Sequence, residues 1–322
     1  MQNKDAELMK IAVTGANGFI GSALTHKLCE KGYNVRGIVR LKGQILNRNG
    51  RFEVFAIGEI NSDTNWNDAL KKIDIVIHLA SRVHKLTDVS INPLADYRRV
   101  NTAGIQRLAE MSAGAEVKRL IFISTIKVNG EKTTGDAFSE NHMANPQDAY
   151  AVSKFEAEQA LHNISGATGL EIVILRPPLV YGQGVKANFL CLLDMVSKNI
   201  PLPLSLVNNK RSMIYIGNLV DAIIECIEHP DAANQTFLVN DGQDVSTPEL
   251  IRMIARAMGK KARLFPCPVS LLKMMAKIAG KSAEIERLIN SLQIDSTKIR
   301  KTLNWIPPFT MEEGILETVK GY

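Results

Sequence analysis

The sequence lacks several features that would define other classes of protein. It has no uninterrupted apolar run of the roughly 18 residues that a membrane-spanning helix needs. Its first seven residues are polar and charged, so no apolar core of a signal peptide precedes the rest. The four cysteines stand apart, without the spacing of a disulfide framework or a metal site. These absences predict a cytoplasmic protein with no metal and no membrane partner.

The net charge of the sequence is also small. The 39 Lys and Arg residues exceed the 33 Asp and Glu residues by +6 over 322 residues. This excess is too weak and too evenly spread to favour a nucleic-acid partner, but it suits a small anionic substrate. A length of 322 residues corresponds to two domains or one large one, at about 150 residues per domain.

The first half of the chain alternates β-branched runs with amphipathic stretches. The pattern predicts strands at 10–14, 34–39, 53–57, 74–79, 119–124 and 171–175, and helices at 19–31, 93–111 and 150–162. Nearly continuous apolar strands that alternate with helices are typical of a parallel sheet covered on both faces. We therefore expect an α/β fold with a doubly wound parallel sheet of the Rossmann type.

Beyond Pro177 the pattern changes, because prolines become more frequent and the helices between them shorter. A further apolar run at 237–240 is typical of a buried strand, which indicates that the two halves are interleaved. We expect a dinucleotide-binding domain over 1–177, to which 211–242 returns. A smaller interleaved C-terminal substrate lobe, over 178–210 and 243–322, then closes over the carboxyl edge of the sheet, where ligands of such sheets bind.

A glycine-rich turn, Gly15-x-x-Gly18-x-x-Gly21, follows the first predicted strand and opens the first helix. Gly15 permits the tight turn, Gly18 lets the backbone approach a pyrophosphate, and Gly21 lets the helix pack closely on the strand. The N–H groups at the start of the helix then face the phosphates. The context predicts a dinucleotide site that also includes Asn17, Phe19 and Ile20.

The end of the second predicted strand bears on which dinucleotide binds. An acidic side chain there accepts the ribose 2′-hydroxyl of NAD, whereas arginine accommodates the 2′-phosphate of NADP. The sequence has Arg40 at this point and no acid. NADP is therefore favoured, with NAD as the alternative. Glu59 and Ile60, after the third strand, are placed where they could meet the adenine.

Tyr150 and Lys154 are four residues apart on a predicted helix and therefore lie on the same face. A free tyrosine has a pKa near ~10, and a neighbouring ammonium group lowers it. Such a pair can move a proton on or off a hydroxyl while a nicotinamide exchanges hydride. Ser124 and Thr125, at the end of the fifth predicted strand, add hydroxyls that could orient the reacting oxygen.

These motifs resemble the extended short-chain dehydrogenase/reductase family, and within it the branch that acts on nucleotide sugars. The resemblance covers essentially the whole chain, and its motifs are Gly15-x-x-Gly18-x-x-Gly21, His78-Leu79-Ala80-Ser81, Val100-Asn101-Thr102-Ala103-Gly104, Tyr150-x-x-x-Lys154 and Arg176-Pro177-Pro178-Leu179-Val180-Tyr181-Gly182. It implies that Tyr150 is the acid/base, that Lys154 binds ribose and that Thr125 touches the substrate oxygen. It also implies cofactor contacts at Leu79, Ala80, Asn101 and Pro177.

The resemblance leaves two reactions open. Related 4,6-dehydratases carry an Asp-Glu pair where this sequence has Ile126 and Lys127, so dehydration lacks its proton donor and acceptor. NADP-dependent reduction of a UDP-4-keto-6-deoxy-hexosamine at C4, in surface-polysaccharide (O-antigen) synthesis, is the main interpretation, because Arg40 indicates an exchangeable NADPH. The alternative is an NAD-dependent UDP-hexose 4-epimerase.

The same resemblance implies residues for a UDP-sugar substrate, which are Arg82, Val83, Lys127, Asn188, Leu190 and Arg211. Arg211 would clamp the diphosphate, a task that suits the geometry of arginine. His84 could face the sugar, whereas His78 is interpreted as a packing residue. The helices at 93–111 and 150–162 suit the interface of a homodimer. The methionines around Met274 and Met275 are typical of a core or a dimer face.

Overall fold

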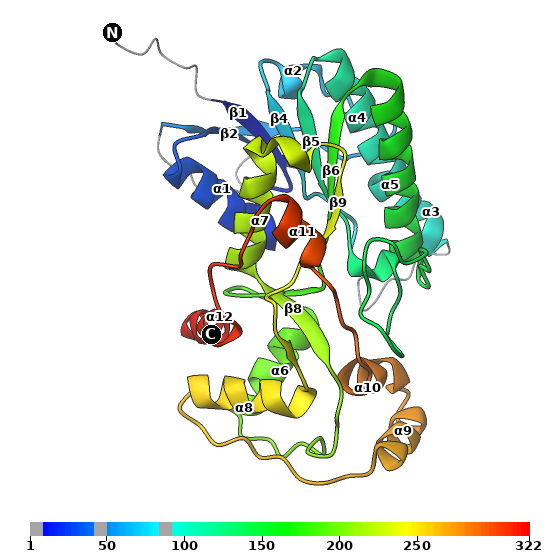
Figure 1. Ribbon diagram of the computed structural model, residues 1–322, viewed down its shortest axis with the longest axis vertical. Helices are drawn as coiled ribbons and strands as arrows, with labels where there is room; N and C mark the ends of the chain where they lie inside the picture. The colour runs from blue at the N-terminus through cyan, green and yellow to red at the C-terminus, as the bar shows by residue number, and fades with distance from the viewer. Residues whose placement is uncertain (1–8, 42–49, 84–91) are drawn as a thin grey trace.

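The computed structural model describes residues 9–41, 50–83 and 92–322. Within these ranges, seven parallel strands form the main sheet in the order β3-β2-β1-β4-β5-β6-β9 (Figure 1). The strands are β1 (Lys10–Thr14), β2 (Asn34–Val39), β3 (Phe52–Ala56), β4 (Ile75–His78), β5 (Arg119–Ile123), β6 (Glu171–Arg176) and β9 (Thr236–Leu238). The strand order reverses between β1 and β4, and ligands of such sheets bind at the carboxyl ends beside this point. The predicted doubly wound fold is confirmed.

Helices cover both faces of this sheet. One face carries α1 (Phe19–Glu30), α7 (Ile216–Glu228) and α11 (Thr297–Thr302), and the other carries α2 (Asn67–Leu70), α4 (Gly104–Gly114) and α5 (Ala149–Thr168). The side chains of β4 show why the strand is apolar throughout. Ile75 and Ile77 enter the core under α1 and α7, and Val76 enters the core under α4 and α5. Successive side chains point to opposite faces, so both must be apolar.

The region 93–111, predicted as one helix, is divided. It consists of α3 (Pro93–Tyr97), a π-helical turn η1 (Arg98–Ala103) and the start of α4. The π-helical turn contains the buried Asn101. Such single π-turns are often found at functional sites, because the extra residue redirects a side chain.

A second, three-stranded sheet builds the lobe below the main sheet in Figure 1. It consists of β7 (Leu179–Tyr181), β8 (Arg211–Tyr215) and β10 (Asp244–Val245), in the order β10-β8-β7. The helices of this lobe are α6 (Ala187–Ser197), α8 (Thr247–Ala257), α9 (Val269–Ile278), α10 (Ser282–Ile289) and α12 (Met311–Lys320). Capping boxes at Ser246 and Thr310 fix the starts of α8 and α12 by pairing with the glutamates three residues on.

The boundaries between the two parts differ in detail from those predicted. The range 211–242 was expected to return to the dinucleotide-binding domain, but β8 pairs with β7 and β10 in the small sheet. Only α7 and β9 rejoin the main sheet. Ile299 of α11, predicted within the substrate lobe, packs in the core of the main sheet. The rest of the domain division stays a prediction.

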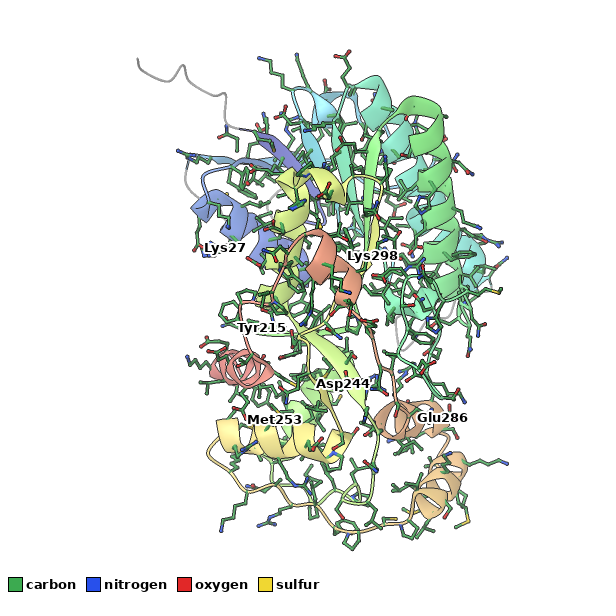
Figure 2. The ribbon with its side chains drawn as sticks, viewed as in Figure 1. Lys27, Tyr215, Asp244, Met253, Glu286 and Lys298 are labelled. Carbon is green, nitrogen blue, oxygen red and sulfur yellow. The ribbon has the colours of Figure 1, made fainter. Side chains whose placement is uncertain are left out.

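Aromatic side chains join the two parts around Tyr215, which Figure 2 labels at the junction. The Tyr215 ring lies 5.8 Å from Tyr181 and 5.3 Å from Phe309, centroid to centroid. The buried Tyr181 hydroxyl donates to Asp241 at 2.7 Å, and Asp241 also accepts from the Tyr215 N–H and from Asn218. The carboxylate therefore ties a strand of the small sheet to a helix of the main sheet.

Candidate active site

The turn after β1 has the shape that a dinucleotide pyrophosphate requires. Gly15 has a φ of +67°, and its N–H donates to Ile38 O at 3.0 Å. An added Cβ on Gly15 would lie 2.9 Å from the nitrogen of Ala80, so a side chain there would push the turn away from β4. Gly18 begins α1 without a side-chain cap, and the first helical turn carries no acidic residue. The positive end of the helix dipole therefore faces the turn unopposed.

The other residues predicted in this turn lie with it. Asn17 and Gly18 are exposed, Phe19 and Ile20 are half-buried, and Gly21 is buried. An added Cβ on Gly21 would collide with the carbonyl of Gly15, so this helix could not approach the strand with any larger residue. The residues present fit a nicotinamide dinucleotide, with its pyrophosphate against the start of α1.

Thr14 joins the carboxyl ends of β1 and β4. Its hydroxyl accepts hydrogen bonds from the N–H groups of Leu79 and Ala80, each at 3.2 Å, and lies 2.9 Å from Nδ1 of His78. Burial lowers the pKa of His78 to about 3, so the imidazole is neutral at physiological pH. This agrees with a packing role for His78. Leu79 and Ala80, predicted at the cofactor, lie directly beside the glycine turn.

The predicted adenosine-side residues lie at the surface. Arg40 directly follows β2 and is exposed. Glu59 is exposed as well, and its carboxylate lies 3.6 Å from the guanidinium of Arg99. Ile60 packs against Gly104 of α4, where an added Cβ would strike it. The contacts of these residues with a cofactor stay predictions.

Lys154 is buried under the end of β5. Its Nζ donates to the carbonyl of Ile123 at 2.7 Å and lies 4.3 Å from the centre of the Phe122 ring. Burial lowers its pKa to about 7, and the negative charge of Glu158 acts in the opposite direction. The ammonium is thus anchored at the carboxyl edge of the sheet, near the glycine turn.

Tyr150 lies one helical turn before Lys154, on the same side of α5. Burial raises its pKa to about 12, a hydrogen bond with Ser81 opposes this, and the charges of Asp148 and Tyr97 add to it. The pKa of Tyr150 is thus above its usual value, and Lys154 is not among the groups that shift it. The Lys154 ammonium instead donates to the Ile123 carbonyl. That Lys154 lowers the pKa of Tyr150 stays a prediction.

Ser124 does not present a free hydroxyl to the site. Its side chain is buried and donates to the carboxylate of Glu158. Arg176 completes this cluster, since its Nε lies 3.0 and 3.2 Å from the two oxygens of Glu158 and its Nη1 lies 2.9 Å from Asn129. Ser124 was predicted to act on the substrate with its neighbour. That role stays a prediction, and the structure shows that the Ser124 hydroxyl donates its proton to a buried carboxylate.

Thr125 stands at the start of a short 3-10 turn, η2 (Ile126–Val128), that leaves the end of β5. The Thr125 hydroxyl accepts from the Lys127 N–H at 3.3 Å, a long bond that leaves the hydroxyl proton for another acceptor. Pro177, predicted at the cofactor, holds this turn through its carbonyl, which accepts from the Ile126 N–H at 3.0 Å.

Lys127 was predicted to touch the substrate, but two carboxylates hold it. Its Nζ lies 2.6 Å from Asp148 and 2.8 Å from Glu131. Asp148 is the N-cap of α5, where its other oxygen accepts from the Ala151 N–H at 2.7 Å. The three charges sum to −1, and their ion pairs connect the turn after β5 with the start of α5, the helix that carries Tyr150.

Asn101 uses its amide to brace the loop after β4. Its oxygen accepts from the Ser81 hydroxyl at 3.0 Å and from the Arg82 N–H at 2.8 Å, and its nitrogen donates to the Ser153 hydroxyl at 3.1 Å. Asn101 was predicted at the cofactor. The structure shows it connecting this loop to α5, so that Ser81 is held where it meets Tyr150.

Arg211 lies in β8 and is half-buried. Its Nη1 donates to the carbonyls of Arg287 at 2.8 Å and Asn290 at 3.1 Å. Burial lowers its pKa, the negative charge of Glu131 opposes this, and the positive charge of Arg287 adds to it. Two guanidinium groups therefore lie near each other at the side of the lobe that faces the turn after β5.

The remaining predicted substrate residues lie in two segments, the loop after β4 and helix α6. Arg82 lies 3.4 Å from Asp96 and stacks 5.6 Å from the centre of the Tyr97 ring, which in turn contacts Tyr150 edge-on. Val83 is exposed. His84 lies outside the described residues. Asn188 and Leu190 are in the first turn of α6, exposed and half-buried respectively.

Several residues of the site were not predicted. Asp148 has a sequence signal, because an aspartate directly before a helix is a common N-cap. Glu158 also has one, since it follows Lys154 by four residues and so lies on the same helix face. Ser81 lies in the quoted motif His78-Leu79-Ala80-Ser81, although no role was predicted for it, and Arg287 carries no local pattern of its own.

Comparisons with known proteins agree with this geometry. The model of the family described as "NAD dependent epimerase/dehydratase family" matches residues 11–240. The chain is 44% identical over 315 residues to a UDP-glucose 4-epimerase of Vibrio cholerae, covering 97% of this chain and 95% of the relative. It is 25% identical over 325 residues to an N-acetyl-alpha-D-glucosaminyl-diphospho-ditrans,octacis-undecaprenol 4-epimerase of Escherichia coli O157:H7, covering 96% and 94%. A crystal structure of UDP-glucuronic acid 4-epimerase from Bacillus cereus in complex with NAD matches with a TM-score of 0.79 and 25% identity, over 97% of this chain and 98% of the other.

Proposed function

The chain belongs to the NAD-dependent epimerase/dehydratase family, and from that premise we propose that it is a UDP-hexose 4-epimerase. The observation that carries this is the 44% identity with a UDP-glucose 4-epimerase over 97% of the chain. The site is compatible, because Lys154 is anchored at the carboxyl end of β5 and Tyr150 bonds to Ser81, which directly follows the Leu79 and Ala80 that pack against Gly15. From the sequence alone, net reduction at C4 was the main interpretation and 4-epimerisation the alternative. The relatives support 4-epimerisation better than net reduction.

Tyr150 is the group that takes the proton from the sugar O4 and returns it. A nicotinamide dinucleotide held by the Gly15–Gly21 turn would supply reversible hydride exchange with C4 of the sugar. Ser81 and Thr125 orient the sugar oxygen and the phenol by hydrogen bonds. Lys154 holds a positive charge under this oxygen and binds the ribose, which stabilises the phenolate when the site is filled.

Dehydration is disfavoured by the residues after Thr125. Ile126 is buried and apolar, and the ammonium of Lys127 is neutralised by Asp148 and Glu131. Neither can donate a proton to a leaving hydroxyl or remove one from carbon. The catalytic side chains therefore act at C4 alone.

Arg211 and Arg287 support a substrate with a diphosphate. Paired guanidinium groups bind phosphate oxygens in bidentate fashion, and partial burial strengthens such contacts. With Asn188 and Leu190 on α6, they would hold UDP in the lobe while the sugar reaches Tyr150. We also propose a cytoplasmic homodimer that acts in surface-polysaccharide synthesis, a role supported by the similarity to an undecaprenol-linked sugar epimerase.

A net 4-ketoreductase is the second candidate, and one observation favours it. Arg40 is exposed at the end of β2, and no acidic side chain occupies Asn34–Leu41. This arrangement suits the 2′-phosphate of NADP. NADPH must exchange at every turnover of a reductase, whereas an epimerase regenerates its cofactor within each cycle.

Product analysis of the purified protein distinguishes the two. We expect UDP-glucose or UDP-N-acetylglucosamine to be converted to its C4 epimer with no added reductant, as measured by NMR, and Tyr150→Phe to abolish this. Consumption of NADPH with a UDP-4-keto-6-deoxy-hexosamine, in the absence of epimerisation, would establish the reductase instead. Neither activity with any UDP-sugar would refute both.

A further inference from the structure

The positive charge of this protein is concentrated in one segment. Residues 252–281 contain eight of the 39 Lys and Arg residues and no Asp or Glu, which leaves 31 basic against 33 acidic residues in the rest of the chain. The eight are Arg252, Arg256, Lys260, Lys261, Arg263, Lys273, Lys277 and Lys281, and all but the half-buried Lys260 are exposed. The charge is thus less evenly spread than its modest total indicates. We call residues 252–281 the basic segment.

Within the basic segment, α9 exposes an apolar stripe. Leu271, Met274, Met275 and Ile278 are 40, 55, 52 and 82% exposed. Their spacing of i, i+3, i+4 and i+7 places all four on one side of the helix. The inward side is occupied by other residues, since Leu272 and Ala276 are buried. The Met stripe is therefore not core, contrary to one of its predicted roles.

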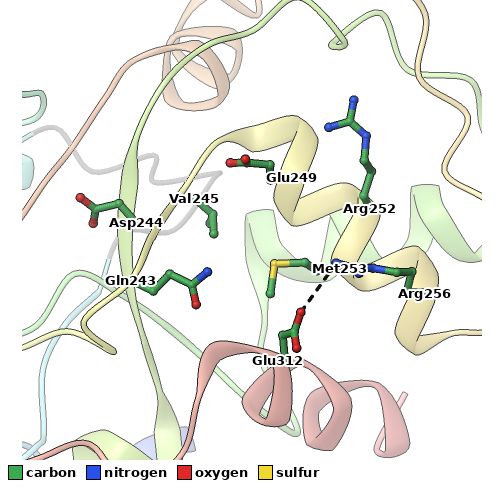
Figure 3. A pocket seen from close by; sticks show the side chains of 8 residues that line it. All are labelled: Gln243, Asp244, Val245, Glu249, Arg252, Met253, Arg256 and Glu312. Carbon is green, nitrogen blue, oxygen red and sulfur yellow. Dashed lines mark ion pairs between the residues drawn. The ribbon is translucent and has the colours of Figure 1, made fainter.

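The basic segment lies at one end of the molecule. In Figure 1 it runs from α8 along the lower end of the lobe to α9, away from the main sheet. A groove of about 610 Å³ on this end is lined by Arg252, Arg256, Lys260 and Lys261 together with Ser205 and Leu264. Figure 3 shows a neighbouring pocket that acidic and basic side chains line together. There Arg256 faces Glu312 at 3.8 Å, and the wall of the pocket also carries Glu249.

We propose that the basic segment binds the surface of an anionic lipid bilayer, with the apolar stripe of α9 inserted among the acyl chains and the cations on lipid phosphates. An exposed apolar stripe beside lysines is the pattern of helices that lie in a membrane interface. Lysine and arginine side chains are attracted to anionic headgroups. Among the described residues no helix is long and apolar enough to cross a membrane, and surface binding does not require one.

Two other occupants fit less well. A second copy joined through this surface about a twofold axis would bring eight cations against eight like charges, because the same patch faces itself. The cations could also bind the phosphates of a nucleic acid, but a nucleic acid has no apolar surface that would cover the exposed residues Leu271, Met274, Met275 and Ile278. A bilayer provides both partners at once.

Flotation of the full chain with vesicles tests the proposal. We expect binding to vesicles of equal phosphatidylglycerol and phosphatidylcholine, and none to phosphatidylcholine alone. Substituting Lys273, Lys277 and Lys281 together by Gln should weaken partitioning on the order of 100-fold, because each surface cation contributes about a factor of five to binding. Ile278→Gln should weaken it about tenfold, since the substitution removes apolar contact with the acyl chains.

Matched controls separate the basic segment from general surface effects. Ile306→Gln changes an equally exposed isoleucine, at 75%, outside the segment. A triple variant of the exposed Lys71, Lys118 and Lys132 to Gln removes the same charge elsewhere. Both controls should bind vesicles as the wild type does. The proposal is overturned if the wild type ignores anionic vesicles, if the controls lose binding as much as the segment variants, or if the segment variants change only dimerisation or binding to duplex DNA.

Discussion

Glu158→Gln is the substitution that tests the buried charge cluster beneath the active site. Glu158 is 2% exposed, and it receives hydrogen bonds from Ser124 and from the guanidinium of Arg176. Glutamine has nearly the same shape but no charge, so Arg176 is left as a buried cation without its counterion. The change affects two quantities, the stability of the fold and the pKa of Lys154.

The loss of stability follows from the burial of both partners. Breaking a buried ion pair by removing one member costs about 3–5 kcal/mol, because the other charge stays desolvated. In a chain of this size each kcal/mol lowers Tm by roughly 2–4 °C, so a fall of about 6–20 °C is expected. Glu156→Gln, on the same helix, is the matched control. Its partner Arg98 is half exposed, and exposed pairs contribute about 0–1 kcal/mol.

The catalytic effect has a defined sign. The pKa of Lys154 is about 7, and the charge of Glu158 raises it. Without that charge the pKa of Lys154 falls further. If catalysis requires the ammonium, activity is lost as pH rises through this pKa, and the variant should lose it at lower pH than the wild type.

Thermal denaturation and the pH profile of kcat measure the two effects. In the double variant Glu158→Gln, Arg176→Met, both charges are gone and most of the lost Tm should return. A Tm within 2 °C of wild type for Glu158→Gln alone would show that the cluster is not a desolvated ion pair. An unchanged or raised alkaline limit of activity would show that Lys154 does not act as a cation controlled by Glu158.

Three further predictions concern the same helix. Tyr150→Phe should lower turnover by about 10²–10⁴-fold while cofactor affinity, measured by fluorescence titration, stays within a factor of two. Asp148→Asn keeps the helix cap but removes a charge that raises the pKa of Tyr150, so the pKa of Tyr150 should fall. Lys127→Met removes the cation that neutralises Asp148, so the pKa of Tyr150 should rise. Shifts of the same sign in both pH–kcat profiles would contradict this coupling. The free energy of unfolding of the wild type, measured by urea titration, should increase between about pH 7 and pH 9, because in this range only the unfolded state binds a proton at Lys154. In Lys154→Met this increase should be smaller. A rise of equal slope in the variant would exclude Lys154 as its source.

The main sheet was predictable because its strands are buried on both faces. Val76 and its neighbours Ile75 and Ile77 must all be apolar when each face carries helices, so β4 is an unbroken apolar run in the sequence. The glycine turn is equally local, since Gly15 and Gly21 have no room for a Cβ. What could not be predicted is the division of 93–111 into two helices around a π-helical turn, which is set by tertiary contacts of Asn101.

The arrangement of Tyr150 and Lys154 on one helix face was predictable from the sequence, but the pKa values of the side chains in the candidate site were not. The spacing of Tyr150 and Lys154 is a property of any helix, whereas the pKa of Tyr150 depends on burial and on Asp148, which Lys127 holds from another element. The role of Ser124 likewise depends on Glu158, 34 residues away in the chain. Sequence patterns indicate which side chains share a face, but they do not indicate which of them are desolvated.

Oxidation at C4 and reduction at C4 are the same step in opposite directions, so the proposed catalytic residues Tyr150, Thr125 and Lys154 would serve an epimerase and a reductase equally. The difference between the two reactions must therefore lie where the cofactor is retained or released. On this chain we propose that this is the exposed surface around Arg40 and Glu59, the predicted adenosine end of the site. Identical catalytic side chains can thus belong to either enzyme, and the choice between them rests on the adenosine end of the site and on the products formed.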